Sequence, residues 1–382
     1  MELLWATDDF VIAGQQFPGF PILLFDSMES VDPVNQFFRH YLLRGVIGSR
    51  RSWPNTGRAL YDFFSFLQAH EIDWRDVDRG EAKSLVAAYR DYCLVSCELA
   101  PSTTRQRLTY ICKFYEYALS QGWVRRLPFA YEERSVNRET SFFAHIDARG
   151  GKAIANDVMP RSYKALPKFL TLVEIEKLLA ASENPHHHIM MRLALHLGLR
   201  REEIAAFPLS YVLKPDNIKW TGPNLRIHLD PFDGSGMVTK GRKPRLIYIS
   251  RKFMGMLYRY VTKVRGERAS LSVNPQKALL LNQAGKPYSD HGKSLNRIIK
   301  ETGKRAGIEV HMHMLRHTYA TQTLANLNRT PGSGLDPLVF LQRQLGHSSI
   351  QTTMIYLHLV NEIADEAVLA YDDELNALAD EA

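Results

Sequence analysis

The chain has 382 residues, too many for one ordinary core, and its 45% hydrophobic and 23% charged residues exclude a disordered or fibrous protein. No apolar run approaches the ~20 residues that a membrane-spanning helix needs, and the acidic start is unlike a signal peptide, so we expect a cytoplasmic protein without a membrane partner. The formal net charge is +7 although residues 362–382 hold eight acids and no lysine or arginine, which favours a polyanionic partner for the rest of the chain.

The first part of the chain predicts a small all-helical domain over residues 31–130. Residues 1–30 are mixed in character and are expected to form an N-terminal extension with an extended segment, FPGFPILLF. From Val34 onward, bulky apolar residues recur at spacings of three and four, which is typical of amphipathic helices. The last of these helices follows Pro101 and ends at Gly122, a residue typical of helix C-termini.

This last helix mixes basic with aromatic side chains. Arg105, Arg107 and Lys113 alternate with tyrosine and phenylalanine in STTRQRLTYICKFYEYALSQG. Two interpretations stay open: a solvated basic face, or a face that contacts nucleic acid. We therefore treat Arg105, Arg107 and Lys113 as candidate DNA-binding residues.

Residues 131–168 lose the helical periodicity and carry glycines and prolines, which predicts an interdomain linker. A second domain is expected over 169–360, opening with Thr171 and Glu174 at the spacing of a capping box. Short β-like segments, LRIHL, PRLIYIS and ALLLN, interrupt its helical stretches. The fold class is therefore mainly α, with two domains and a small antiparallel sheet in the second. Residues 361–382 are expected to form an acidic C-terminal helix or tail.

Four short motifs in the second domain combine basic and nucleophilic residues. They are GLRREE with Arg200 and Glu203, TKGRKPR with Lys240, HMHMLRHTYAT with His313 and Arg316, and LGHSSIQTTMIY with His347 and Tyr356. Each motif alone is more often ordinary structure, since an arginine at a helix start is usually solvated and a tyrosine at helical spacing usually packs. Their order along one chain is much harder to explain by chance.

In this order the motifs resemble the tyrosine recombinase, or phage integrase, family, most specifically in HxLRHTxAT and LGHSSxxTTxxY. The resemblance is strong over residues 170–357, whereas the N-terminal domain resembles the family's helical (SAM-like) core-binding domain in pattern only. It implies a site-specific recombinase that cleaves and rejoins DNA through a 3′-phosphotyrosine. The reaction would serve integration, excision or transposition of a mobile element.

The resemblance also assigns roles to the motif residues. Arg200 and Arg316 would hold the non-bridging phosphate oxygens, because guanidinium groups bind them in a fork and stay charged. Tyr356 would attack phosphorus. His313 would act as the base that assists the tyrosine, and Lys240 as the acid that protonates the 5′-oxygen.

Two further residues complete this set. His347 would donate a hydrogen bond to the phosphate, and Glu203 would support the Arg200 helix. The preserved phosphodiester energy makes rejoining independent of ATP and metal, so no cofactor or metal is expected. The histidine run 186–188 is read as surface or cap residues, since adjacent histidines on a helix point in different directions.

Long turn-rich intervals separate Arg200 from Lys240 and Arg316 from His347. Such loops are tolerated at surfaces, but they leave the geometry of the Lys240 hairpin open. Lys243 and Arg245 share this hairpin and compete with Lys240 for the acid role. Arg242 and Lys243 join the candidate DNA-binding residues.

The resemblance implies double-stranded DNA with inverted-repeat sites as the partner. A homotetramer would exchange strands through a Holliday junction, with accessory proteins as further partners. In the acidic tail, Val368, Leu369 and Leu375 have helical spacing and are expected to dock onto a neighbouring subunit.

Two other functions remain as alternatives. The same residues would serve a type IB topoisomerase or a hairpin-forming resolvase. A third interpretation is a DNA-binding protein without catalysis, although the chain has all six residues that the resemblance assigns to catalysis.

Overall fold

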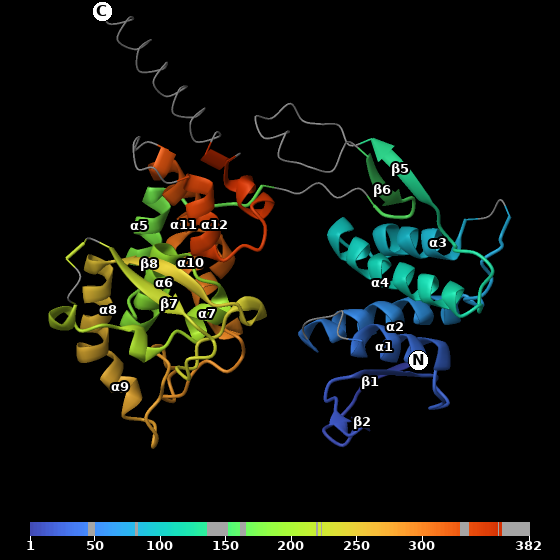
Figure 1. The fold of residues 1–382 in the computed structure, drawn as a ribbon, viewed down its shortest axis with the longest axis horizontal. Coiled ribbons are helices and arrows are strands. Elements are labelled where there is room, and N and C mark those ends of the chain that lie inside the picture. Colours follow the sequence, from blue (N-terminus) through green and yellow to red (C-terminus); the bar gives the residue numbers. More distant parts are fainter. Residues whose placement is uncertain are drawn as a thin grey trace, which may run out of the picture. The chain divides into compact units, whose positions relative to one another are not determined.

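A computed structural model of the chain describes residues 1–44, 50–80, 83–135, 152–160, 166–218, 221–222, 224–328, 336–357 and 359–360. The chain divides into two compact units, Met1–Lys164 and Ala165–Ala382. Both units are mainly helical, and their strands pair in antiparallel two-stranded sheets (Figure 1). The prediction of a mainly α protein with two domains and a small antiparallel sheet is confirmed.

The first unit is built on helices α1 (Asp32–Leu43), α2 (Trp53–Ala69), α3 (Leu85–Asp91) and α4 (Pro101–Ser120). A π-helical segment, Tyr92–Ser96, continues α3, and a short 3-10 turn, Arg50–Ser52, precedes α2. The paired strands are β1 (Glu2–Trp5) with β4 (Pro21–Leu24), β2 (Val11–Ile12) with β3 (Gln15–Gln16), and β5 (Tyr131–Ser135) with β6 (Lys152–Asn156).

Residues 1–30 are part of the first unit's core and do not form the separate extension that the sequence predicts. Phe20 and Leu23 are buried among the side chains of the helices. The buried Asn35 of α1 accepts a hydrogen bond from the Leu23 N–H and donates one to its carbonyl oxygen, both at 2.8 Å. This pairing joins strand β4 to the bundle, because the polar backbone of a short buried strand needs such a partner.

The range 131–168, predicted as a linker, contains the paired strands β5 and β6. Phe129, just before the hairpin, and Val158, just after it, are both buried in the core of the first unit. The hairpin therefore starts and ends on this unit. Gly and Pro residues end helical periodicity in a β-hairpin as they do in a linker, so the sequence pattern alone does not separate the two.

The second unit contains helices α5 (Leu172–Ala180), α6 (Pro185–Leu197), α7 (Arg201–Ala205), α8 (Arg251–Lys263), α9 (Arg265–Ala269), α10 (Lys293–Ala306), α11 (Met312–Asn328) and α12 (Pro337–Leu345). Residues 351–357 are also helical. Short 3-10 turns lie at Leu209–Tyr211, Pro215–Asn217 and Lys240–Arg242. Among the described residues, no helix is both long and apolar enough to cross a membrane.

Helices α6 and α11 pack against each other in the second unit, and the hairpin of β7 (Asn224–Leu229) and β8 (Arg245–Ser250) covers part of the same core. Alternate residues of β7 are buried, as its period of two requires. The capping box at the start of α5 is confirmed, with Thr171 and Glu174 each bonding the other's backbone N–H.

The segment ALLLN, predicted to be β-like, does not form a strand. Its leucines are buried, but two arginines from α9 satisfy its carbonyls. Arg265 donates to the Leu279 oxygen at 3.0 Å and to the Ala278 oxygen at 2.7 Å, and Arg268 donates to the Leu281 oxygen at 2.6 Å. Because these guanidinium groups supply donors, the segment is buried without a full strand partner.

Candidate active site

Arg200 lies where helix α6 ends and the short helix α7 begins. Helix α6 starts at Asn184, whose side chain accepts two backbone N–H groups, and it ends at Gly198. The φ of Gly198 is 60°, and a Cβ at this position would lie 2.3 Å from the Tyr319 ring. Glycine therefore permits both the left-handed turn and the close packing, and the turn makes Arg200 the N-cap of α7.

Glu203 is a buried carboxylate that holds two arginines. Only 1% of it is exposed, and its oxygens accept the Arg200 backbone N–H at 2.8 Å and Arg200 Nη1 at 3.1 Å. Arg245 donates to the same carboxylate from Nη1 at 2.8 Å and from Nη2 at 2.7 Å. Burial alone would raise the pKa of Glu203, but the hydrogen bonds and charge of Arg245, with the charge of Arg200, lower it to about 2. Arg245 is thus engaged with Glu203, while Lys240 and Lys243 stay exposed.

Three arginines converge on the end of helix α12. Each donates to one of three consecutive carbonyls: Arg245 Nε to Gln344 at 3.3 Å, Arg316 Nη2 to Leu345 at 2.7 Å, and Arg200 Nη2 to Gly346 at 3.0 Å. The last carbonyls of a helix have no partner within it and carry the negative end of its dipole. They therefore hold positive side chains together that would otherwise repel one another.

Arg316 is almost completely buried, with 1% of its surface exposed. Besides its bond to Leu345, it donates from Nη1 to the Gly198 oxygen at 2.5 Å, so it joins the end of α6 to the end of α12. Burial and then the neighbouring charge of Arg200 lower the pKa of Arg316 to about 9, so it stays positive at neutral pH.

His347 follows directly after α12. The helix ends at Gly346, whose φ is 66°, and a Cβ there would lie 2.7 Å from the side chain of Arg245. The Nδ1 of His347 is 2.9 Å from the Thr353 hydroxyl. Burial and then the charges of Arg316 and Arg200 lower its pKa to about 3, so the ring is neutral near pH 7.

Tyr356 belongs to the helical residues 351–357 and is only 2% exposed. Its hydroxyl lies 2.9 Å from Nδ1 of His317, and its ring stacks on that of His347 with centres 6.3 Å apart. Burial raises the pKa of Tyr356, while the charges of Arg316 and Arg200 act in the opposite direction. The hydroxyl is thus held against α11, the helix that also carries Arg316.

His317 is the residue that sequence reasoning missed, because the motif assigns the reacting imidazole to His313. It follows His313 by four residues on α11, and this spacing on one helical face was the available signal. The two rings meet edge to face with centres 4.4 Å apart. Burial lowers the pKa of His317 to about 3, and that of His313 to about 4 with a further contribution from Arg316.

Lys240 opens the 3-10 turn between β7 and β8, and its side chain is exposed. Its charge is among those that lower the pKa of His313, which places Lys240 within electrostatic range of that ring. Hydrogen bonds and ring contacts thus bring five of the predicted catalytic residues into one cluster: Arg200, His313, Arg316, His347 and Tyr356. The sixth, Lys240, joins them through the effect of its charge on His313.

The candidate DNA-binding residues differ in how strongly their side chains already bind other parts of the protein. On α4, Arg107 forms an ion pair with Asp62 and so is held by its own unit. Arg105 is exposed and donates to the Pro160 oxygen at 3.1 Å, while the Lys113 ammonium lies 5.8 Å from the Tyr41 ring centre. Its ion pair with the half-buried carboxylate of Asp62 makes Arg107 the weakest of these candidates.

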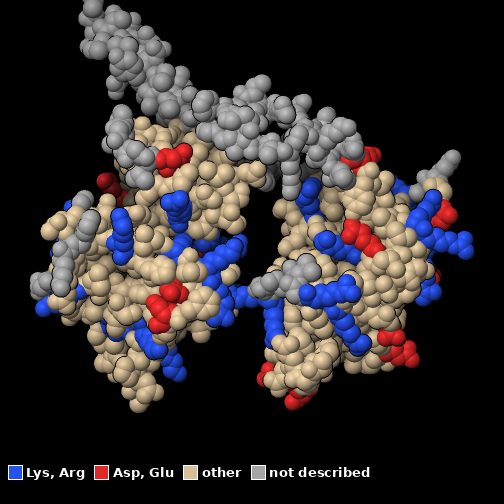
Figure 2. Space-filling view, viewed as in Figure 1, with Lys and Arg blue, Asp and Glu red and all other residues tan. Residues whose placement is uncertain are grey.

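In the second unit, Arg242 and Lys243 are both exposed. The guanidinium of Arg242 lies 4.7 Å from the centre of the Phe232 ring. On the face of each unit seen in Figure 2, lysine and arginine side chains are more numerous than acidic ones. This surface charge suits a polyanion.

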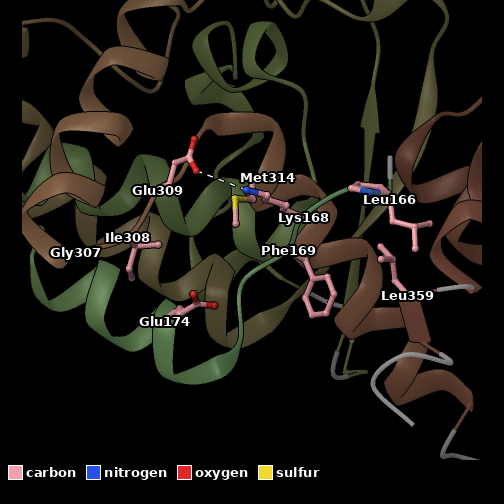
Figure 3. A pocket seen from close by; sticks show the side chains of 10 residues that line it. Leu166, Lys168, Phe169, Glu174, Gly307, Ile308, Glu309, Met314 and Leu359 are labelled. Carbon is pink, nitrogen blue, oxygen red and sulfur yellow. Dashed lines mark ion pairs between the residues drawn. The ribbon is translucent and has the colours of Figure 1, made fainter. Parts of the chain in front are cut away.

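A hollow of about 460 Å³ lies elsewhere in the second unit (Figure 3). Apolar side chains including Leu166, Phe169 and Leu359 line it, together with an exposed ion pair in which Lys168 lies 3.6 Å from Glu309. None of the six clustered residues lines this hollow, so it is separate from the candidate active site.

Replacing Glu203 with glutamine is expected to lower the free energy of unfolding at pH 7 by about 3 kcal/mol, because it removes a buried carboxylate and leaves two partly buried arginines without their counter-charge. The pKa of Glu203 is lowered in the folded protein, so its contribution is full above its ordinary pKa of 4.5 and is lost as pH falls toward about 2. The difference between wild type and Glu203→Gln should therefore shrink below pH 4.5.

Urea unfolding of the full chain at several pH values measures this effect. Glu301→Gln is the matched control, because the ion pair of Glu301 with Arg297, at 3.8 Å, is exposed. Equal stability of Glu203→Gln and wild type at pH 7 would contradict the assigned role of Glu203.

Comparison with known proteins provides separate evidence for the family of the chain. The family model described as the phage integrase family matches residues 168–362. The chain is 27% identical to tyrosine recombinase XerC of Roseiflexus sp. (strain RS-1), over 86% of this chain and 89% of that protein. It is 26% identical to transposase A from transposon Tn554 of Staphylococcus aureus, over 89% of this chain and 91% of the transposase.

A solved structure shares the fold. It is the XerH site-specific recombinase bound to a palindromic difH substrate in a post-cleavage complex, with a TM-score of 0.56. The likeness covers 90% of this chain and 88% of the other at 16% sequence identity. At this identity it is evidence for the fold alone.

Proposed function

The chain belongs to the phage integrase family and is a site-specific tyrosine recombinase, an enzyme that cleaves and rejoins DNA strands; from this premise we propose that Tyr356 is the residue that becomes joined to DNA. The observation that carries the proposal is the buried Tyr356 hydroxyl, which lies 2.9 Å from His317 on α11, the helix that also carries Arg316. The partner is double-stranded DNA, and the reaction serves integration, excision or transposition.

Arg200 and Arg316 form the proposed phosphate site. The hydrogen bonds of Arg316 to Gly198 and Leu345 use two of its five N–H donors, which leaves others for phosphate oxygens. Both guanidinium groups are already held by protein carbonyls, so little reorganisation is needed when the phosphate arrives. Fixed positive charge of this kind stabilises the extra negative charge of a pentavalent transition state. His347, neutral near pH 7, adds a hydrogen bond to the same phosphate.

In the proposed cleavage step, the Tyr356 oxygen bonds to phosphorus as the bond from phosphorus to the 5′-oxygen breaks. The tyrosine proton passes to a histidine, and Lys240 gives a proton to the departing 5′-oxygen. The product is a 3′-phosphotyrosine and a free 5′-hydroxyl. Rejoining is the reverse step with a 5′-hydroxyl from the partner strand, and the total number of phosphodiester bonds is unchanged.

Two histidines share the proposed base role. The sequence assigns it to His313, but the hydroxyl of Tyr356 contacts His317. Burial lowers the pKa of both imidazole rings, so both are neutral near pH 7. Each ring therefore has a nitrogen that can accept a proton. We place His317 as the first acceptor and His313 beside it in the cluster.

The recombination product requires two DNA sites, and we propose that four copies of the chain assemble on a pair of inverted-repeat sites. Strand exchange then proceeds in two steps through a Holliday junction, with accessory proteins as further partners. The symmetry of this tetramer would let the Tyr356 residues of two copies act in the first step and those of the other two copies in the second.

Val368, Leu369 and Leu375, proposed to dock onto a neighbouring subunit, lie outside the described residues. Deleting the residues after Ala364 is expected to weaken tetramer formation on DNA at least tenfold while changing the affinity of one subunit for a single site less than twofold. Native gels with one-site and two-site duplexes measure both quantities. Unchanged tetramer formation would count against docking by the tail.

Covalent capture tests the proposed function. Nicked duplexes from the DNA that flanks the gene, and a second set with randomised sequence, are incubated with the full chain. The short fragment beyond the nick diffuses away after cleavage, so the phosphotyrosine adduct accumulates and survives denaturation. Adducts that map to Tyr356 support the proposal, whereas binding without any adduct would mean that the chain does not cleave DNA.

A further inference from the structure

Lys240 differs from the other five clustered residues in how it is held. Its side chain is exposed and donates no hydrogen bond to the parts of the chain that the structure describes. A general acid must nevertheless reach one oxygen atom with good geometry. The position of Lys240 therefore depends on the backbone turn that carries it.

This turn has an unfavourable backbone conformation. Gly241 has a φ of 69°, and Arg242 follows with a φ of 53°, in the left-handed region that residues with a Cβ rarely adopt. Thr239, on the other side of Lys240, is buried. A backbone hydrogen bond from the Arg242 N–H to the Thr239 oxygen, at 3.0 Å, closes the turn. Because Arg242 has a disfavoured φ, a contact to its side chain from outside the turn adds to what holds this shape.

Phe232 supplies that contact. Its ring lies 4.7 Å from the guanidinium of Arg242, in the arrangement of a cation–π interaction, yet 62% of the side chain is exposed. A large exposed aromatic residue gains little from its own packing. The contact with Arg242 accounts for a phenylalanine at this exposed position.

The loop that carries Phe232 is itself anchored to the second unit. The Asp233 carboxylate accepts the Tyr211 hydroxyl at 2.6 Å, and Tyr211 packs against the main core. Lys277 donates from Nζ to the Gly234 oxygen at 2.9 Å. This loop lies in the long interval between Arg200 and Lys240. These hydrogen bonds fix the loop, so Phe232 is held in place beside the turn.

We propose that Phe232 is a positioning residue for Lys240, because it holds Arg242 and so fixes the turn from which Lys240 protonates the leaving 5′-oxygen. The inference rests on the acid role proposed for Lys240. Phe232 itself touches neither the DNA phosphate nor the leaving group. Losing its ring should affect proton donation and leave phosphate binding by the arginines unchanged.

A substrate whose leaving group needs no proton separates an effect on proton donation from an effect on phosphate binding. In a duplex whose 5′-bridging oxygen at the cleaved bond is replaced by sulfur, the bond from phosphorus to sulfur breaks and the sulfur departs as a thiolate. Thiols have a pKa of about 8.5, so this leaving group needs no proton. The duplex is the one captured by the wild-type chain, made with oxygen or with sulfur, and single-turnover cleavage is measured for each.

On the oxygen substrate we expect Lys240→Ala to cleave at least about 10²-fold more slowly than wild type, and Phe232→Ala about tenfold more slowly. On the sulfur substrate both variants should cleave within about twofold of wild type, since positioning of the acid no longer matters. Phe232→Tyr, which keeps the ring face, should restore the rate on the oxygen substrate.

Arg226→Ala is the matched control, because Arg226 lies 5.7 Å from the Tyr248 ring on the body of the same hairpin. It should not change the ratio of the two rates. The inference is overturned if Phe232→Ala slows both substrates equally or slows neither. If Lys240→Ala is equally slow on both substrates, the proposed acid role itself fails.

Discussion

Replacing Tyr356 with phenylalanine is expected to abolish covalent capture of DNA, with strand cleavage reduced on the order of 10⁴-fold or more. The phenyl ring fills the same buried space, and the described hydrogen bond of the hydroxyl is the one with His317. Losing that bond should lower the free energy of unfolding by about 1 kcal/mol, too little to unfold the chain. DNA binding should persist, because the arginines are unchanged.

Tyr260→Phe is a closely matched control for this prediction. Tyr260 is also buried, and its hydroxyl lies 2.9 Å from Nδ1 of His186, the same distance as in the Tyr356 pair. This variant should lose similar stability and keep full cleavage. An adduct formed by Tyr356→Phe at the wild-type rate would show that another residue is the nucleophile.

Replacing Arg316 with lysine is expected to slow single-turnover cleavage about 10³-fold, even at saturating DNA. A lysine ammonium is a single point of charge, so it does not bind the Gly198 and Leu345 carbonyls and a phosphate oxygen together. The variant should also lose about 2 kcal/mol of stability, because at least one buried carbonyl loses its donor.

Arg265→Lys separates the two consequences of this change. Arg265 is likewise buried and donates to backbone carbonyls of Leu279 and Ala278, but it is not in the catalytic cluster. It should lose comparable stability in urea unfolding without a specific loss of cleavage. If Arg316→Lys cleaves within tenfold of wild type, Arg316 does not provide the proposed transition-state charge.

Local features made much of the fold predictable from the sequence. The capping box at Thr171 and the glycine after α6 act through neighbouring residues, so a single stretch of sequence reveals them. The strands LRIHL and PRLIYIS were likewise predictable from their alternation, which is a property of each strand. Local signals failed for ALLLN, where backbone pairing is limited to an isolated bridge between Ala278 and Pro208 and arginines from another helix bind the carbonyls.

The sequence by itself determined the mainly helical class, because periodicity is a property of short segments. Its motifs also indicated the candidate catalytic residues, through their resemblance to the phage integrase family. Only the tertiary structure decided which side chain each of these residues meets. Three such pairs join residues from different elements: His317 with the Tyr356 hydroxyl, Arg245 with Glu203, and Phe232 with Arg242. Such pairings depend on how the helices and the hairpin pack, because direction and distance across a core are not encoded in the spacing of either partner.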